Sequence, residues 1–154
     1  MNNNNVNNNV NNTNIIHVWS GPRSLSTALM YSFSQRPDCK VFDEPLYANY
    51  LRNFASQRRP YKQQLIDSNP KTGNEILLSL NNDSQNKLVF AKHIVKQFTD
   101  DLDINLLTQN GSKHVILIRN PFDMIMSWSK KESVHNESQD IDGTNVIDLV
   151  QLFF

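Results

Sequence analysis

The chain has little cysteine and no excess charge of either sign. Cys39 is its single cysteine, so no disulfide can form within the chain. This excludes a small secreted scaffold held by disulfides and favours a reducing, cytoplasmic location. Lysine plus arginine and aspartate plus glutamate number 15 each. Because proteins that bind nucleic acid through phosphate contacts carry a basic excess, we expect no nucleic-acid partner.

Long apolar runs are also missing. No stretch approaches the roughly 18 apolar residues that cross a bilayer, so we expect no membrane partner. The first residues have neither the basic segment nor the apolar segment that directs secretion. Hydrophobic residues make up 38% of the 154 residues, which suits one soluble domain of ordinary size.

Asparagine dominates the first fourteen residues. Ten of the residues 1–14 are asparagine, which gives this segment almost nothing to bury. We therefore expect a disordered tail over 1–14 and one folded domain over 15–154.

Short apolar runs alternate with helical patterns in the rest of the chain. Four runs are too short for helices and are predicted as strands: Ile15–Trp19, Cys39–Phe42, Leu88–Ala91 and His114–Ile118. Helices are expected from Ser24 to Pro37, within 46–55, at about 98–109 and from Pro121. This order predicts an α/β domain with three layers and a mainly parallel sheet. Ligands of such domains bind at the carboxyl ends of the strands.

The loop after the first strand has the composition of an anion site. Residues 20–27 read Ser-Gly-Pro-Arg-Ser-Leu-Ser-Thr and lead into a helix. Backbone amides at a helix start, together with the guanidinium of Arg23, suit phosphate oxygens. The loop does not fit the nucleotide-triphosphatase pattern G-x-x-x-x-G-K-[ST]. The alternative is that Ser24 merely caps the helix.

A second segment places polar groups after the fourth predicted strand. Arg119 follows that strand, Pro121 suits the first turn of a helix, and Ser127 lies about two turns along it. Taken alone, Arg119 could equally form a structural ion pair and Ser127 could be solvated.

Together, the two segments resemble the cosubstrate-binding elements of the sulfotransferase superfamily. Three stretches in order are similar to its sulfotransferase-like P-loop proteins: Trp19–Arg23, Asp43–Tyr47 and Leu117–Pro121. The resemblance implies a P-loop-like fold and the cosubstrate 3′-phosphoadenosine 5′-phosphosulfate (PAPS), with no metal expected.

The resemblance also implies roles for individual residues. The turn containing Arg23, Ser24, Ser26 and Thr27 would hold the 5′-phosphosulfate, with Arg23 also neutralising charge during transfer. Arg119 and Ser127 would hold the 3′-phosphate. The partner would be a small-molecule acceptor that offers a hydroxyl or an amine.

The ends of two other strands carry further candidates. Lys92 and His93 follow the third apolar run, and the resemblance implies a histidine here that takes the acceptor's proton. Adjacent residues on a strand point to opposite faces, so both cannot face one site unless the strand has ended. Asp43 and Glu44 could contact the acceptor. Alternatively, Asp43 caps the loop and Pro45 fixes its turn.

The sequence departs from the superfamily after Lys131. It has no Gly-rich segment of the kind that closes over the nucleotide, so we expect a domain that is incomplete on its C-terminal side. A helix is predicted over 146–154, whose apolar residues suggest self-association or a partner surface. Two alternatives to a working sulfotransferase stay open: a non-catalytic remnant or interaction module, and a P-loop kinase or nucleotide hydrolase.

Overall fold

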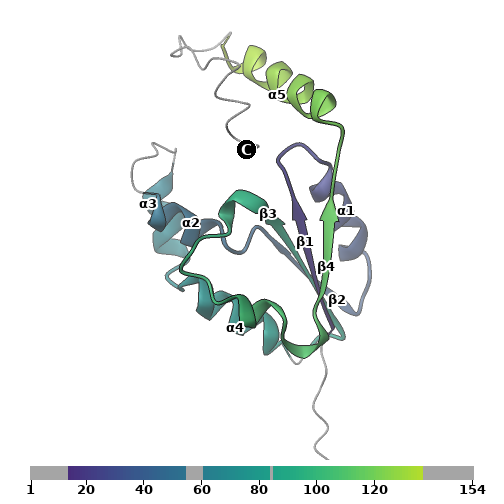
Figure 1. The fold of residues 1–154 in the computed structure, drawn as a ribbon, viewed down its shortest axis with the longest axis vertical. Helices are drawn as coiled ribbons and strands as arrows, with labels where there is room; N and C mark the ends of the chain where they lie inside the picture. Colours follow the sequence, from purple (N-terminus) through teal and green to yellow (C-terminus); the bar gives the residue numbers. More distant parts are fainter. Residues whose placement is uncertain (1–13, 55–60, 84, 137–154) are drawn as a thin grey trace, which may run out of the picture.

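A four-stranded parallel sheet forms the centre of the molecule (Figure 1). The computed structural model describes residues 14–54, 61–83 and 85–136. The strand order is β2-β3-β1-β4. Its members are β1 (Asn14–Ser20), β2 (Cys39–Asp43), β3 (Leu88–Ile94) and β4 (Lys113–Leu117). The predicted α/β class and parallel sheet are confirmed, and β1 starts at Asn14, which was assigned to the tail.

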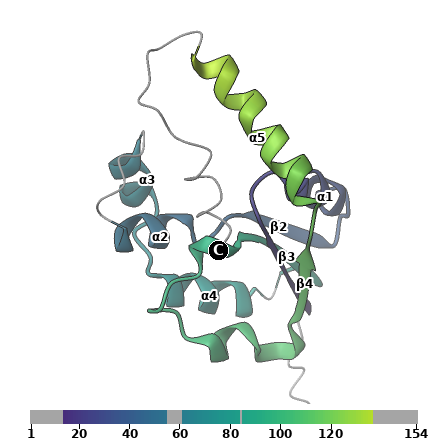
Figure 2. The same cartoon turned by 45° about the horizontal axis from the view of Figure 1, so that its top comes forward.

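Helices lie on both faces of this sheet and give the three layers (Figure 2). α1 packs on one face and α4 on the other, while α2 and α3 pack together beside β2 and β3. α5 starts after the end of β4 and extends away from the sheet (Figure 1). The helices are α1 (Ser26–Ser34), α2 (Tyr47–Asn53), α3 (Lys62–Ser68), α4 (Gly73–Asn81) and α5 (Pro121–Asn136).

Alternate residues of β1 and β3 supply the two halves of the core. Ile15 and Val89 point toward α4, where Leu77 and Leu80 pack on them. The residues between them point the other way, as Phe90 does when it packs on Phe33 of α1 with ring centroids 4.4 Å apart. Because both faces of these strands are buried, their sequences read as continuous apolar runs. Removing this apolar surface from water is the main force that holds the layers together.

The helix predicted over 98–109 is wrong. This segment instead holds two short 3-10 turns, Ile104–Leu107 and Gln109–Gly111. Asp103 explains the difference, because its side chain accepts a hydrogen bond from the backbone amide of Asn105 at 2.9 Å. Local bonds of this kind compete with those of a regular helix. The apolar Leu106 and Leu107 still reach the core, which is why the spacing looked helical.

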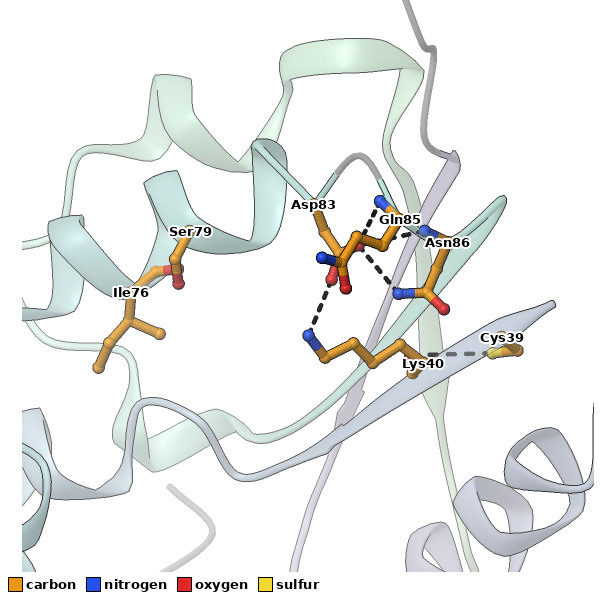
Figure 3. A network of polar contacts seen from close by, with 7 residues as sticks. All are labelled: Cys39, Lys40, Ile76, Ser79, Asp83, Gln85 and Asn86. Carbon is orange, nitrogen blue, oxygen red and sulfur yellow. Dashed lines mark hydrogen bonds and ion pairs between the residues drawn. The ribbon is translucent and has the colours of Figure 1, made fainter. Parts of the chain in front are cut away.

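Asp83 fixes the connection between α4 and β3 (Figure 3). Its carboxylate accepts hydrogen bonds from the backbone amides of Gln85 and Asn86, both at 3.2 Å. Lys40 of β2 donates to it at 3.0 Å and so ties the connection to the edge of the sheet. Burial would raise the pKa of Asp83, but hydrogen bonds from Asn86 and Lys40 outweigh burial and lower it. The carboxylate therefore stays ionised and holds the loop at neutral pH.

β4 is the opposite edge of the sheet and is mostly exposed. Val115 is 42% exposed and Ile116 is 72% exposed. A continuous apolar run such as His114–Ile118 is typical of a strand covered on both faces, but β4 is not covered in this way by the described residues. No helix in the described parts of the chain is long and apolar enough to cross a membrane.

Candidate functional site

A cavity of about 430 Å³ lies at the carboxyl ends of the strands, where α1 and α5 begin. Among the described residues, four cationic side chains line it, from Arg23, Lys92, Lys96 and Arg119, against a single carboxylate, that of Glu44. Clefts lined by one sign of charge concentrate ligands of the opposite sign. The cavity is thus suited to an anionic ligand.

The loop between β1 and α1 forms one wall of this cavity. Arg23 and Leu25 both adopt left-handed backbone conformations, with φ of 62° and 64°. Ser24 donates from its hydroxyl to the carbonyl of Gly21 at 2.6 Å, which holds the turn closed. Helix α1 starts at Ser26 and Leu25 occupies its N-cap position without a side-chain bond. Ser24 therefore does not cap the helix, and the first amides of α1 are left for a ligand.

The structure brings the two predicted phosphate-binding segments together. Arg23 donates from Nε to the hydroxyl of Ser127 on α5 at 3.0 Å. Arg119 donates from Nη1 to the backbone carbonyl of Arg23 at 2.9 Å. Ser26 and Thr27 line the same cavity. Residues about a hundred positions apart in the chain thus line one cavity.

Lys92 lies at the bottom of the cavity and is paired with both carboxylates of the Asp43-Glu44 turn. Its ammonium is 2.7 Å from Asp43 Oδ1 and 2.8 Å from Glu44 Oε1. Burial would lower the pKa of Lys92, but the hydrogen bonds to Asp43 and Glu44 outweigh burial and raise it. The lysine therefore stays charged and holds Glu44 in place.

Gln97 completes this arrangement, and sequence reasoning missed it. It donates from Nε2 to Glu44 Oε2 at 2.6 Å, so each carboxylate oxygen of Glu44 has its own donor. The side chain is 2% exposed, and its Oε1 has no partner among the described residues. Gln97 is three residues beyond β3, and the short 3-10 turn Val95–Gln97 carries it back over the cavity. Its position six residues after the third apolar run was the available signal.

Glu44 and Tyr47 line both the first cavity and a second one of about 320 Å³. Asp43, Pro45 and Leu65 line the second cavity. Glu44 has a left-handed backbone, with φ of 48°, which turns the chain sharply after β2. Asp43 lines the second cavity but not the first.

His93 lies on the other face of the sheet. β3 continues through Ile94, so Lys92 and His93 point in opposite directions, and His93 is 0% exposed. Its Nε2 is 3.0 Å from Nδ1 of His17, and its ring stacks on Trp19 with centroids 4.3 Å apart. His93 is not part of the cavity lining. The expectation that it takes a proton from a bound acceptor does not fit this placement.

Burial keeps His17 and His93 of this layer neutral. Desolvation, assisted by repulsion from neighbouring histidines, lowers the pKa of His93 to about 3 and that of His17 to about 4. Trp19 donates from Nε1 to His114 Nδ1 at 3.0 Å, and the other nitrogen of His114 bonds to the Leu107 carbonyl at 3.0 Å. The layer joins β3, β1 and β4 in the core, which is a structural role.

Among the described residues, no group of three or more histidine, cysteine, aspartate or glutamate side chains is arranged to hold a metal ion. His17, His93 and His114 therefore do not form a metal site of this kind.

Comparison with known proteins identifies the family. A family model described as "Sulfotransferase domain" matches residues 14–148. Two proteins of Arabidopsis thaliana, named branched-chain-amino-acid aminotransferase-like proteins 2 and 1, are 44% and 41% identical to it over 117 residues. These matches cover 75% of this chain and 20% of each relative, so the chain spans about one fifth of their length. No solved structure gives a significant match.

Proposed function

The chain belongs to the sulfotransferase domain family, and from that premise we propose that it binds PAPS and transfers the sulfuryl group to a small-molecule acceptor. The acceptor offers a hydroxyl or an amine. In the reaction the acceptor atom bonds to sulfur, the bond from sulfur to the phosphate oxygen breaks, and 3′-phosphoadenosine 5′-phosphate (PAP) leaves.

The observation that carries this proposal is the meeting of Arg23, Arg119 and Ser127 in one cationic cavity. The superfamily resemblance assigned these residues to two phosphate groups of one cosubstrate. A ligand with two separated phosphate groups needs donors from two segments, and the cavity offers both. The first amides of α1, next to Ser26 and Thr27, add donors without a bound side-chain cap.

Each polar residue named above has a defined role in this proposal. Arg23, Ser24, Ser26 and Thr27 hold the 5′-phosphosulfate, and Arg119 and Ser127 hold the 3′-phosphate. Because Arg23 donates to Ser127 in the structure, its guanidinium lies next to a residue assigned to the 3′-phosphate. Arg23 and Lys92 stabilise the negative charge that moves to the leaving phosphate. A preorganised donor of this kind contributes on the order of 3 kcal/mol to the transition state.

Glu44 takes the acceptor's proton in this proposal, in place of His93. Glu44 lines both the cationic cavity and the second cavity, so an acceptor bound in the second cavity would lie beside it and near the sulfuryl group. Lys92 and Gln97 fix both of its oxygens. The second cavity then holds the acceptor, with Asp43 on its wall.

The test is PAP formation from PAPS in the presence of a panel of hydroxyl and amine acceptors. Glu44→Gln is expected to lower the rate by roughly two to four orders of magnitude, because general-base catalysis contributes about that much. Binding of PAP should change little. The control is His93→Gln with its unfolding temperature measured. A rate that depends on His93 and not on Glu44 would contradict the assignment.

A further inference from the structure

The two cavities that share Glu44 differ in the charge of their walls. Cations outnumber carboxylates around the first cavity among the described residues. The second cavity is lined by the carboxylates of Asp43 and Glu44, and none of its described lining residues is a lysine, an arginine or a histidine. It is formed by the end of β2, the start of α2 and part of α3 (Figure 1). Walls of this sign attract a cationic ligand.

Lys92 divides the charge between the two cavities. Its ammonium pairs with Asp43 Oδ1 at 2.7 Å and with Glu44 Oε1 at 2.8 Å. Two carboxylates and one ammonium leave a net negative charge in this group of three residues. Lys92 lines the first cavity and not the second, whereas Asp43 lines the second and not the first. The negative charge is therefore displaced toward the second cavity, which favours an anion on one side of Glu44 and a cation on the other.

Two side-chain oxygen atoms of the second cavity have no hydrogen-bond partner among the described residues. They are Oδ2 of Asp43, whose Oδ1 accepts from Lys92, and Oδ1 of Asn69, whose Nδ2 donates to other groups of α3. Arg52 donates to the backbone carbonyl of Asn69 but is not among the lining residues. Because these oxygens can only accept, they need donors from a ligand. An ammonium group offers three N–H donors and the matching charge.

Asp43 and Glu44 consequently differ in what they offer an acceptor. Lys92 and Gln97 hold both oxygens of Glu44, which lines both cavities and was assigned the acceptor's proton above. Asp43 keeps one open oxygen, and its side chain is 52% exposed. Resting on the proposed function, we propose that the acceptor is an amino alcohol. Its protonated amine binds Asp43 and Asn69, and its hydroxyl lies beside Glu44.

The hydroxyl is the group that reacts, because an ammonium has no lone pair with which to attack sulfur. The hydroxyl oxygen bonds to sulfur, and the bond from sulfur to the phosphate oxygen of PAPS breaks. The hydroxyl proton moves to Glu44, PAP leaves with the electron pair of the broken bond, and the amine stays protonated throughout. Asp43 and Glu44 contact the same ammonium of Lys92, so their carboxylates are neighbours and a short carbon chain can join the two groups of the acceptor. Pro45 and Leu65 give that chain an apolar wall.

Binding of matched alcohols tests the charge preference without relying on turnover. The protein is titrated, with and without PAP, with 3-aminopropan-1-ol, butan-1-ol and 3-hydroxypropanoate, and binding is followed by ligand-observed NMR. These compounds have chains of similar length and differ in charge. The amino alcohol should bind about tenfold more tightly than butan-1-ol, because it adds a charge-assisted hydrogen bond at a half-exposed carboxylate. The anionic 3-hydroxypropanoate should bind more weakly than either.

Asp43→Asn is the variant that should remove this preference. It deletes the charge but keeps an oxygen that can accept from Lys92, and the affinity ratio of amino alcohol to butan-1-ol should fall to about twofold or less. Asp67→Asn is the matched control, because Asp67 is an exposed carboxylate of α3 that accepts from Gln63 and lines neither cavity. The control should keep the full preference. Thermal unfolding of both variants checks that each is folded.

Turnover separates this proposal from the proposed function. PAP formation from PAPS should rank the three acceptors in the same order by kcat/KM. Equal kcat/KM for butan-1-ol and the amino alcohol would overturn the amino-alcohol proposal and leave the transferase function standing. Tight binding of the amino alcohol through Asp43, with no PAP formed from any acceptor, would contradict the transferase function and leave the cation site standing. Equal binding of the three compounds, or a preference that survives Asp43→Asn, would overturn the cation site itself.

Discussion

The two faces of the sheet at Lys92 and His93 serve different purposes, although these residues are neighbours in the chain. Lys92 opens onto a cavity where each charged group has a partner and cations outnumber carboxylates. His93 packs in a layer of aromatic rings, where burial keeps it and His17 neutral. Both side chains are buried, at 3% and 0% exposure. Burial alone therefore does not separate a site residue from a structural one; the face does.

Acidification is expected to produce the largest effect on this comparison. The pKa values of His17 and His93 are lowered to about 4 and about 3 in the folded state, while an unfolded histidine has about 6.5. Below pH 6.5 the unfolded state therefore binds protons that the native state refuses, so stability falls with decreasing pH. The two groups together should remove about 4 kcal/mol between pH 7 and pH 5. The slope should fade as the pH falls through the folded values.

Denaturant unfolding at a series of pH values measures this loss. The matched control is the double variant His17→Phe and His93→Phe, which should unfold with a much weaker pH dependence over the same range. An unchanged slope in the control would show that other groups cause the acid sensitivity.

His93→Ala is expected to have the next largest effect, on stability and not on binding. The substitution leaves a void against Trp19 and removes the partner of His17. Truncation of a buried ring costs roughly 3 kcal/mol. Chemical denaturation should show this loss, while calorimetric titration with PAP should give a dissociation constant close to that of the parent protein. A large loss of PAP affinity in a folded variant would place His93 in the site after all.

Arg23→Ala is expected to have the opposite pattern, a loss of PAP affinity with little change in stability. Arg23 lines the cavity and is an exposed residue, so stability should change by less than about 1 kcal/mol. Loss of charge-assisted hydrogen bonds should weaken PAP binding about a hundredfold. Arg36→Ala is the control, because Arg36 is an exposed arginine that pairs with Asp38 away from the cavity. Equal affinities of Arg23→Ala and the parent protein would remove Arg23 from the site.

Ser127→Ala should show the smallest and most selective effect. A hydroxyl that binds the 3′-phosphate contributes about 1 kcal/mol, or roughly a fivefold change in affinity. The change should appear with PAP and not with adenosine 5′-phosphate, which has no 3′-phosphate. Similar losses for both nucleotides would show that Ser127 acts through Arg23, with which it shares a hydrogen bond.

The strands and the loop at 20–27 could be predicted from the sequence because the residues that indicate them are close together in the chain. Continuous apolar runs mark β1 and β3, and the residues at 20–27 carry their own donors. The helix predicted over 98–109 failed because Asp103 satisfies nearby amides and the turns keep the apolar residues inward. The burial of β4 failed because a run of Val, Ile and Leu does not say whether the strand lies inside the sheet or at its edge.

The choice among candidate site residues needed the structure. Lys92 and His93 could be separated only once β3 was known to continue through Ile94. Glu44 became a candidate because Lys92 of β3 and Gln97 of the turn after β3 both donate hydrogen bonds to its carboxylate. Neither contact can be inferred from the sequence around Glu44. Gln97 carries no local motif, so its position beyond the third apolar run was too weak a signal.

The most direct test of the central claim is a comparison of two nucleotides by thermal unfolding. The protein is heated with PAP, or with ATP and Mg²⁺, at the same ionic strength. PAP at about a hundred times its dissociation constant adds roughly 2.7 kcal/mol, which raises the unfolding midpoint by a few degrees. We expect this rise with PAP and little change with ATP and Mg²⁺. A rise with ATP and Mg²⁺ alone, or no rise with PAP, would contradict the assignment of the cationic cavity to a 3′-phosphorylated nucleotide.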